Sequence, residues 1–144
     1  MSAHDPKPGA DLYRARLIGA DLRSHDLRRA NFALANLKDA VLVDAILSDC
    51  LLFAAKLSGA DLTGAHLEHA DLSEADLFGA NLRSADATGA DFRRANLALA
   101  NLRGARLTNA ILREANLNGA DLTDAQLDGA DLSGAVFGEA EPDE

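Results

Sequence analysis

The sequence predicts an all-β parallel β-helix, a β-solenoid in which short strands of successive coils pair with one another. Alanine occupies nearly every fifth position from residue 10 to residue 140, and leucine or phenylalanine nearly every fifth position from residue 12 to residue 137. These positions define 26 consecutive five-residue units over residues 10–139, with no insertion, deletion or proline. Such regularity indicates one quasi-one-dimensional domain in which each coil contacts only its neighbours.

A period of five excludes both an α-helix and a straight strand. Leucines five residues apart on a helix rotate by about 140° at each step, so they cover the whole circumference instead of one face. On a straight strand the side chains alternate between faces, so successive leucines would point in opposite directions. The chain must therefore bend once in every unit. This bend lets each central leucine, and the alanine two residues before it, point inward.

The corner of each unit is predicted at the second residue after the central leucine. This position is glycine in nine of the 26 units and aspartate or asparagine in five others, and these residues tolerate the backbone angles of tight corners. The three prolines, Pro6, Pro8 and Pro142, lie outside the array. Because proline cannot donate to a strand ladder, its absence from the array supports continuous pairing between coils.

The units at residues 60–64 (ADLTG) and 130–134 (ADLSG) resemble the pentapeptide-repeat signature A(D/N)LxG. The resemblance extends over about nine-tenths of the chain. It implies a right-handed quadrilateral β-helix with four units in each coil, so that the 26 units make about 6.5 coils. A right-handed coil also agrees with the general preference of parallel crossover connections.

The chain divides into a flexible N-terminal segment at residues 1–9, the repeat array at residues 10–139 and an acidic C-terminal tail at residues 140–144. The N-terminus has no basic region followed by an apolar run, so no signal peptide is expected. No stretch approaches the roughly 18 apolar residues of a membrane span. The single cysteine, Cys50, suits a reducing compartment. We therefore expect a cytoplasmic protein that does not bind membranes.

The net charge of −9 is concentrated near the C-terminus. Residues 1–113 contain 14 acidic and 14 basic side chains, whereas residues 114–144 contain nine acidic side chains and no lysine or arginine. The rod is therefore expected to be electrically polar along its axis. The array has no basic stripe with interleaved aromatic residues, so direct nucleic-acid binding is not expected.

Catalytic and cofactor sites are not predicted. An interior filled with leucine and alanine leaves no concave site, and no nucleophile motif or phosphate-binding loop occurs. His66 and His69, with Glu68 between them, are the only hint of a metal site. Two histidines without a third strong ligand are better interpreted as solvated surface residues. We expect no enzyme activity, no cofactor and no metal.

A break in the outward-facing pattern is the candidate protein interface. The position before the central leucine is aspartate or asparagine in 16 of 26 units, but it is apolar in three successive units. With four units in each coil, the residues around this break form an apolar girdle that comprises Tyr13, Leu34, Val41, Val43, Ile46, Leu51 and Phe53. Contiguous apolar surface indicates an interface. A purely structural role stays the alternative, because β-branched residues also suit half-exposed strand positions.

These features predict a non-catalytic protein-binding or scaffolding rod that acts through its outer surface. The resemblance supplies an alternative function. Some bacterial pentapeptide-repeat proteins mimic B-form DNA, bind DNA gyrase or topoisomerase IV and protect these enzymes from quinolones. The residues do not identify the partner protein. A monomer and an end-to-end homodimer are both compatible with the sequence.

Three residues interrupt the interior pattern. Cys50 replaces an inward alanine and is expected to act as a small buried hydrophobic residue. Ala87 replaces a central leucine between Leu67 and Leu107, which predicts an underpacked site. His25 replaces an alanine in the first coil, and a polar ring there predicts a frayed end, because a buried imidazole needs hydrogen-bond partners.

Overall fold

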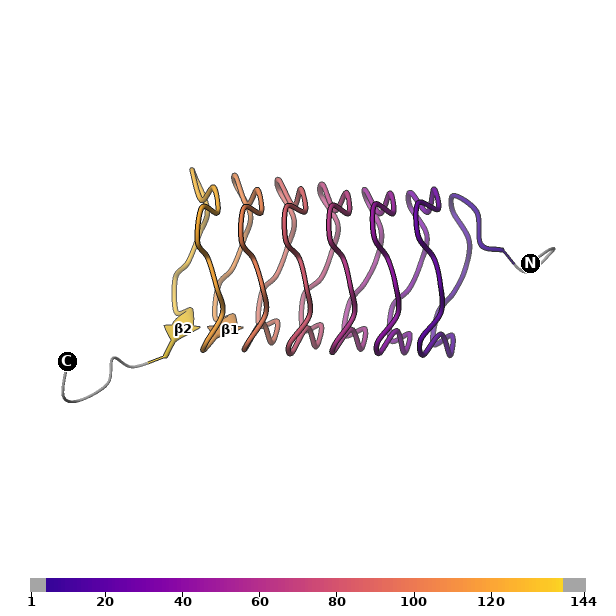
Figure 1. Ribbon diagram of the computed structural model, residues 1–144, viewed down its shortest axis with the longest axis horizontal. Helices are drawn as coiled ribbons and strands as arrows, with labels where there is room; N and C mark the ends of the chain where they lie inside the picture. The colour runs from indigo at the N-terminus through magenta and orange to yellow at the C-terminus, as the bar shows by residue number, and fades with distance from the viewer. Residues whose placement is uncertain (1–4, 139–144) are drawn as a thin grey trace.

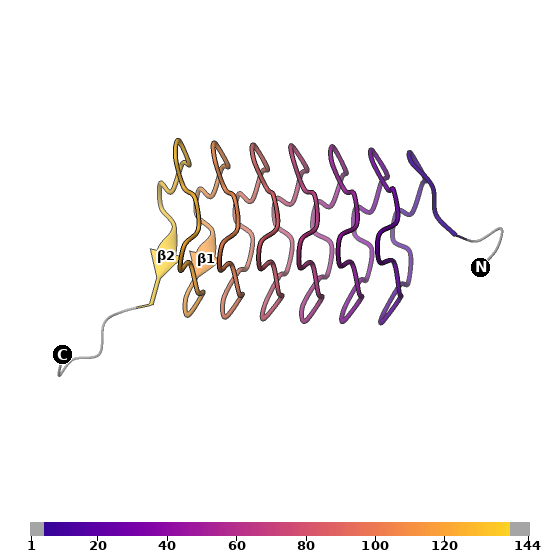
Figure 2. The same cartoon turned by 45° about the horizontal axis from the view of Figure 1, so that its top comes forward.

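The computed structural model describes residues 5–138, which form a rod of stacked coils. The coils follow one another in chain order along the rod, and each coil lies directly beside the next (Figure 1). A view turned by 45° shows the same regular stack (Figure 2). Residues 1–4 and the predicted acidic tail at 140–144 lie outside the described residues.

Parallel pairing between residues 20 positions apart holds the coils together. The bridges run from Asp11 with Asn31 to Ile111 with Asp131, one in each unit. Near the C-terminus, pairing extends into two short strands, β1 (Asn116–Leu117) and β2 (Val136–Phe137), which are parallel with Asn116 opposite Val136. A spacing of 20 residues means that four five-residue units complete one coil, as expected. The rod therefore has four sides.

We name each side by the central residue of its first unit. The Leu12 side contains the units centred on residues 12, 32, 52 and every twentieth residue after them. The Leu17, Leu22 and Leu27 sides follow in chain order in the same way. Every residue thus lies beside the residues 20 positions before and after it. No helix long and apolar enough to cross a membrane occurs within residues 5–138.

Every unit ends in the same tight turn. The N–H of the next alanine donates to the carbonyl of the central residue, as Ala65 does to Leu62 at 3.0 Å. The corner residue between them has positive φ in every unit from Gly9 to Gly134, which is the feature of type II turns. Sixteen of these corner residues are not glycine. The repeated pairing with both neighbouring coils imposes this left-handed geometry, although it costs about 1–2 kcal/mol for other residue types.

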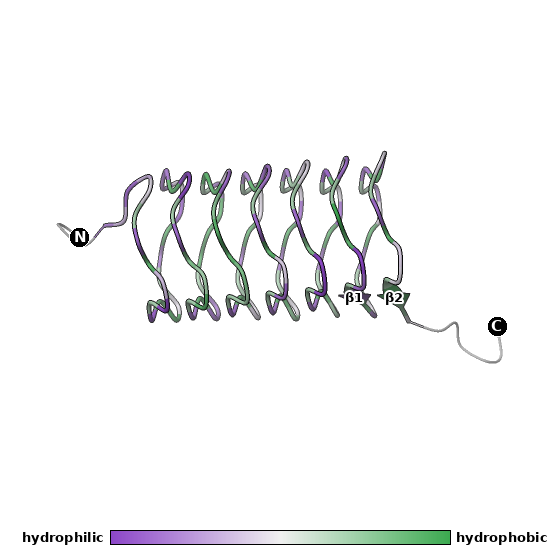
Figure 3. Cartoon of the chain, turned by 180° about the vertical axis from the view of Figure 1, so that it is seen from behind, coloured by the Kyte–Doolittle hydropathy of each residue, from purple (hydrophilic) through white to green (hydrophobic). Residues whose placement is uncertain are grey.

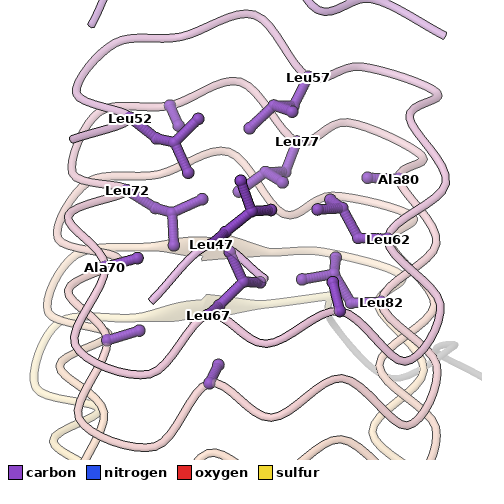
Figure 4. Packing of buried hydrophobic residues seen from close by; sticks show 14 of the residues in the cluster. Leu47, Leu52, Leu57, Leu62, Leu67, Ala70, Leu72, Leu77, Ala80 and Leu82 are labelled. Atoms are coloured by element: carbon purple, nitrogen blue, oxygen red, sulfur yellow. The ribbon is translucent and has the colours of Figure 1, made fainter. Parts of the chain in front are cut away.

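The core is a continuous column of leucine and alanine along the rod axis. The central residues and the alanines two positions earlier are buried from Leu22 to Leu117. Figure 4 shows how leucines from different sides, among them Leu52, Leu57 and Leu62, point toward one another in the interior. Hydrophilic and hydrophobic stretches alternate along every coil (Figure 3). Each buried leucine contributes about 1.5–3 kcal/mol of stabilisation.

The three interruptions of the core are accommodated differently. Cys50 is fully buried, and its thiol donates to the carbonyl of Leu27 at 2.8 Å. Ala87 is buried in the column between Leu67 and Leu107. Both residues therefore occupy the interior positions that the sequence predicts for them.

His25 is half-buried and has polar partners, so it does not fray the end of the rod. Its Nδ1 lies 3.0 Å from the carbonyl oxygen of Arg23, and its Nε2 lies 4.0 Å from the Asp5 carboxylate. Because a carbonyl oxygen only accepts, Nδ1 carries the proton in the first contact. The first coil is also paired, since the Leu12 N–H donates to the Asn31 carbonyl at 2.7 Å. The frayed N-terminal coil expected from His25 is therefore not observed.

The hydrogen bonds of the coil begin before residue 10. The Gly9 N–H donates to the Arg28 carbonyl at 2.8 Å, and the Ala10 N–H donates to the Lys7 carbonyl at 2.9 Å. Gly9 also has the positive φ of a corner residue. The end of the predicted flexible segment at residues 1–9 thus follows the geometry of the repeat.

Candidate protein-interaction surface

The exposed large apolar residues identify where a partner protein could bind. Among the described residues, nine large hydrophobic side chains are exposed: Tyr13, Ile18, Leu34, Leu51, Phe53, Phe78, Leu99, Val136 and Phe137. All nine belong to the Leu12 and Leu17 sides, which are adjacent. The Leu22 and Leu27 sides contribute none of them between residues 5 and 138.

The apolar girdle is therefore not an exposed band around the rod. Val41, Val43 and Ile46, which lie on the Leu22 and Leu27 sides, are half-buried. The other four residues of the girdle are exposed and lie together on the Leu12 side. Exposed apolar surface runs along the rod on two sides instead of around one coil.

The Phe53 patch consists of Tyr13, Leu34, Leu51 and Phe53 on the Leu12 side. Phe53 is 40% exposed and lies in the third coil along this side. The Leu34 N–H donates to the Phe53 carbonyl at 2.9 Å, which brings these residues into adjacent coils. Arg14 lies over the Tyr13 ring, with Cζ 5.4 Å from the ring centroid. The patch therefore combines aromatic and aliphatic groups with a cation at its edge.

The Leu99 patch consists of Phe78 and Leu99 on the Leu17 side, with Ala98 buried beside them. Leu99 is 60% exposed, more than any other large hydrophobic residue that the structure describes. A Cβ placed on Gly119 would lie 2.6 Å from Leu99 Cδ2. Gly119 therefore leaves the space in which the Leu99 side chain rests against the next coil.

Leu34 and Leu99 are the two leucines among the sixteen corner residues that are not glycine. Both are corner residues with positive φ, 59° for Leu34 and 58° for Leu99. A bulky residue in this region is rare, and strained residues cluster at functional positions. Glycine would satisfy the turn at lower cost, as it does at Gly59 and Gly79. The repeat imposes this geometry at every corner, so the feature particular to these two leucines is a large apolar side chain that is exposed.

Several charged side chains outside the patches form ion pairs with one another. On the Leu12 side, Arg93 contacts Asp91 at 2.7 Å, and Arg94 lies between Glu74 at 3.4 Å and Glu114 at 3.8 Å. Because these groups neutralise one another locally, this part of the side presents neither a basic stripe nor an acidic face. The apolar patches are thus the feature that distinguishes the Leu12 and Leu17 sides.

Two carboxylates have strongly lowered pKa values. The Arg23 guanidinium, which donates to both carboxylate oxygens of Asp21, lowers the pKa of Asp21 to about 2. The Ser133 hydroxyl and backbone N–H, followed by Arg113, lower the pKa of Asp131 to about 2. The contact of Asp21 lies within its own unit, whereas Asp131 also contacts Arg113 of the preceding coil, and neither carboxylate lies in a pocket of residues 5–138.

A catalytic or metal site would need a pocket or a cluster of ligating side chains. No pocket opens in residues 5–138, and no three potential ligands cluster there. His66 Nδ1 lies 3.7 Å from Glu68, and both side chains lie at the surface. Burial raises the pKa of the Cys50 thiol to about 12, so Cys50 is not a reactive nucleophile at neutral pH.

The sequence pattern missed some of this surface. Ile18, Val136 and Phe137 were not expected to be exposed apolar groups. Ile18 directly follows the central residue Leu17, and this place in the repeat already predicts that its side chain faces outward. Val136 and Phe137 belong to the last described unit, and Phe137 occupies a central position that is buried elsewhere in the rod. Within residues 5–138 no further coil lies beside Phe137 to cover it.

Comparison with known proteins identifies similar repeat structures. The profile of the family described as Pentapeptide repeats matches eight copies, at residues 10–49, 55–94, 75–114 and 100–138. A trypsin-treated form of QnrB1, a plasmid-mediated fluoroquinolone resistance protein, is 26% identical with a TM-score of 0.58, over 90% of this chain and 71% of that chain. A search of curated proteins finds no match.

Two cyanobacterial structures are also similar. The pentapeptide repeat protein Rfr23 from the cyanobacterium Cyanothece 51142 is 31% identical with a TM-score of 0.52, over 85% of this chain and 90% of that chain. A pentapeptide repeat protein from Nostoc Pcc 7120 is 39% identical with a TM-score of 0.53, over 54% of this chain and 64% of that chain. In all three structures, the part that this chain resembles is the repeat.

Proposed function

This chain belongs to the pentapeptide-repeat family, and we propose that it is a non-catalytic, cytoplasmic protein-binding rod of about 6.5 right-handed coils that acts through its outer surface. The observation that carries this proposal is the restriction of the exposed large apolar residues to two adjacent sides. A rod that needed these residues only for folding would have no reason to expose them on the same two sides.

The Phe53 patch supplies the expected centre of the interface. Aromatic residues and arginine dominate the energetics of binding surfaces, and on this side Tyr13 and Arg14 lie in the first coil and Phe53 in the third. Polar and ion-paired residues such as Asp91 and Arg93 continue the same side beyond the patch, as a polar rim does around an apolar centre. The proposed partner is a protein with an apolar surface that lies along the Leu12 side.

The test replaces Phe53 by an acid. Phe53→Glu places a charge in the centre of the patch, so it should abolish partner capture while leaving the thermal midpoint nearly unchanged, because the side chain points outward. Arg83→Glu is the matched control, since Arg83 occupies the same position of its unit on the Leu22 side and is exposed. The readout is pull-down with each immobilised protein, combined with thermal unfolding followed by circular dichroism.

The outcomes separate binding from folding. A protein retained by the wild type and by Arg83→Glu, but lost with Phe53→Glu, supports the interface. A large drop in the thermal midpoint of Phe53→Glu would make Phe53 structural. Equal retention by all three proteins would contradict the proposed interface.

The similarity to QnrB1 favours one second candidate function. That protein is a fluoroquinolone resistance protein with 26% identity over 90% of this chain, and action on DNA gyrase or topoisomerase IV is the corresponding proposal here. The test is a gyrase supercoiling assay with and without a fluoroquinolone. Inhibition at low micromolar protein, or protection from drug-induced cleavage, supports this candidate. Unchanged supercoiling and cleavage would reject it and leave the protein-binding rod.

A further inference from the structure

The Leu12 side carries large and small side chains in opposite order on its second and third coils. In the second coil, the residue after the central residue is Ala33 and the corner residue is Leu34. In the third coil, the same two positions hold Phe53 and Ala54. Leu34 and Phe53 are exposed, whereas Ala33 and Ala54 are half-buried. Each coil therefore has a small residue at the position where the other coil has a large one.

A second copy of the chain can bring these positions together. A two-fold axis that runs parallel to the strands of this side, between its second and third coils, reverses the rod axis but keeps the direction of the strands. Each residue then faces the same position of a unit in the other copy, and the second coil faces the third. Because the coils follow one another regularly along the rod, a reversed copy matches coil for coil (Figure 1).

The apolar side chains are complementary in this arrangement. Phe53 of one copy lies over Ala33 of the other, and Leu34 lies over Ala54. Leu51, which is also exposed, is covered by the same contact. Large side chains thus fill the space above small ones on both copies. The apolar surface that they remove from water stabilises the contact by about 25 cal/mol for each Å².

Charge complementarity extends the contact to the coils on either side. The first coil faces the fourth, so the corner residues Arg14 and Glu74 of different copies lie opposite each other, twice in the dimer. Arg14 lies over its neighbour Tyr13, with Cζ 5.4 Å from the ring centroid, and forms no ion pair with another residue of the range 5–138. Glu74 is exposed and contacts Arg94 at 3.4 Å. The contact would therefore give Arg14 a carboxylate partner.

Asp11 and Asp71 are the like charges that face each other in this arrangement. Each is held within its own unit, because Asp11 accepts from the Tyr13 N–H at 3.2 Å and Asp71 accepts from the Ser73 N–H at 2.9 Å. Facing sheets pack about 10 Å apart, a distance at which salt already screens the repulsion of two short side chains. The longer arginine and glutamate side chains at the corners can reach across this distance.

A parallel pair of rods fits this surface less well. A two-fold axis along the rods places each coil opposite itself and reverses the strands, so each corner residue faces the residue before the central one. Arg14 would then face Asp11, but Glu74 would face Asp71. Phe53 would meet Phe53 of the other copy instead of a small residue. The antiparallel arrangement avoids both of these unfavourable contacts.

We propose that two copies of this chain pair side by side and antiparallel through the Phe53 patch, with the first four coils of their Leu12 sides in contact. This inference rests on the proposed function, since it names a second copy as the protein that the patch binds. A surface that is complementary to itself closes at two copies. Because one side of four coils takes part, we expect a weak contact, with a dissociation constant on the order of 10–100 µM.

The test measures the mass of the purified full chain with no other protein present. Sedimentation equilibrium at low salt, from low micromolar to near-millimolar protein, should show a mass that rises from one copy to two and stops there. Phe53→Glu should weaken association by roughly a hundredfold, because it places a charge against Ala33 at the centre of the contact. Thermal unfolding of each variant shows that it is folded.

Arg14→Glu and Glu74→Arg test the orientation. Either variant alone places like charges opposite each other, so each should weaken association by roughly tenfold. An equimolar mixture of the two variants should regain the affinity of the wild type, because every facing pair in the mixed dimer then joins opposite charges. Glu114→Arg is the matched control, since Glu114 is a corner residue of the same side and also contacts Arg94, at 3.8 Å, but lies outside the four coils.

The outcomes separate this proposal from the proposed function. A mass that stays at one copy would overturn the pairing, while the pull-down with Phe53→Glu would still decide whether the patch binds another protein. Growth beyond two copies, or a mixture that associates no better than the single variants, would also overturn the pairing. Stronger association with Glu74→Arg would do the same, because only a parallel pair places residue 74 opposite Asp71.

Discussion

Two units with almost the same sequence have different environments in this rod. Residues 60–64 (ADLTG) lie in the middle and residues 130–134 (ADLSG) in the last coil. Their turns agree: the hydrogen bond that closes each turn is 3.0 Å long, and φ is 68° at Gly64 and 72° at Gly134. The leucines differ, because Leu62 is fully buried whereas Leu132 is half-buried.

The difference lies in the neighbouring coils and not in the units. The Leu62 N–H donates to the Asn81 carbonyl of the next coil at 2.6 Å, whereas Leu132 has no acceptor within residues 5–138. Both units still pair with the coil before them, as Asp131 does with Ala110 at 2.9 Å. A unit therefore encodes its own turn, while its burial and half of its ladder come from residues 20 positions away.

The largest effect is expected from truncating the two leucines. Leu62→Ala should lower the free energy of unfolding by about 3–5 kcal/mol, because it opens a cavity between two coils. Leu132→Ala should cost less than about half as much, because water already reaches one side of that leucine. Urea unfolding followed by circular dichroism measures both. Equal losses of stability in the two variants would contradict this account.

A smaller effect of opposite sign is expected at Ala87, the one central position in the middle of the rod without a large side chain. Ala87→Leu should raise the free energy of unfolding by about 1 kcal/mol, since Leu67 and Leu107 lie on either side of a site that leucine fills elsewhere. Ala85→Leu in the same unit is the control. It should destabilise by about 1–3 kcal/mol, because the alanine positions are closely packed. Loss of stability with Ala87→Leu would mean that the neighbouring leucines already fill the space.

The smallest effect is expected in the pH dependence of stability that Asp131, in the unit at residues 130–134, contributes. The pKa of Asp131 is lowered to about 2 in the folded chain, from an ordinary value near 3.8. Its contribution to stability is therefore present above about pH 4 and is lost as the pH falls toward 2. Asp131→Asn should flatten the fall of the thermal midpoint across this window. Ser133→Ala, which removes the largest cause of the lowered pKa, should move the fall to higher pH. A pH profile identical to that of the wild type in both variants would contradict this account.

The candidate surface could be predicted only in part. Phe53, Leu51, Leu34 and Tyr13 follow from their outward positions and their 20-residue spacing. The half-buried state of Val41, Val43 and Ile46 does not follow from the pattern, because exposure at the same position of a unit depends on the side chains in the coils on either side.

The sequence by itself determined the repeat, its corners and its inward-facing residues, because these depend on interactions within one unit and on a period that neither a helix nor a flat strand can accommodate. Tertiary structure alone decided that Val41, Val43 and Ile46 are half-buried, and that the exposed large apolar side chains of residues 5–138 lie on two adjacent sides. The physical reason is that the burial of a side chain and the ladder hydrogen bonds of its unit depend on residues about 20 positions away, in the coils on either side.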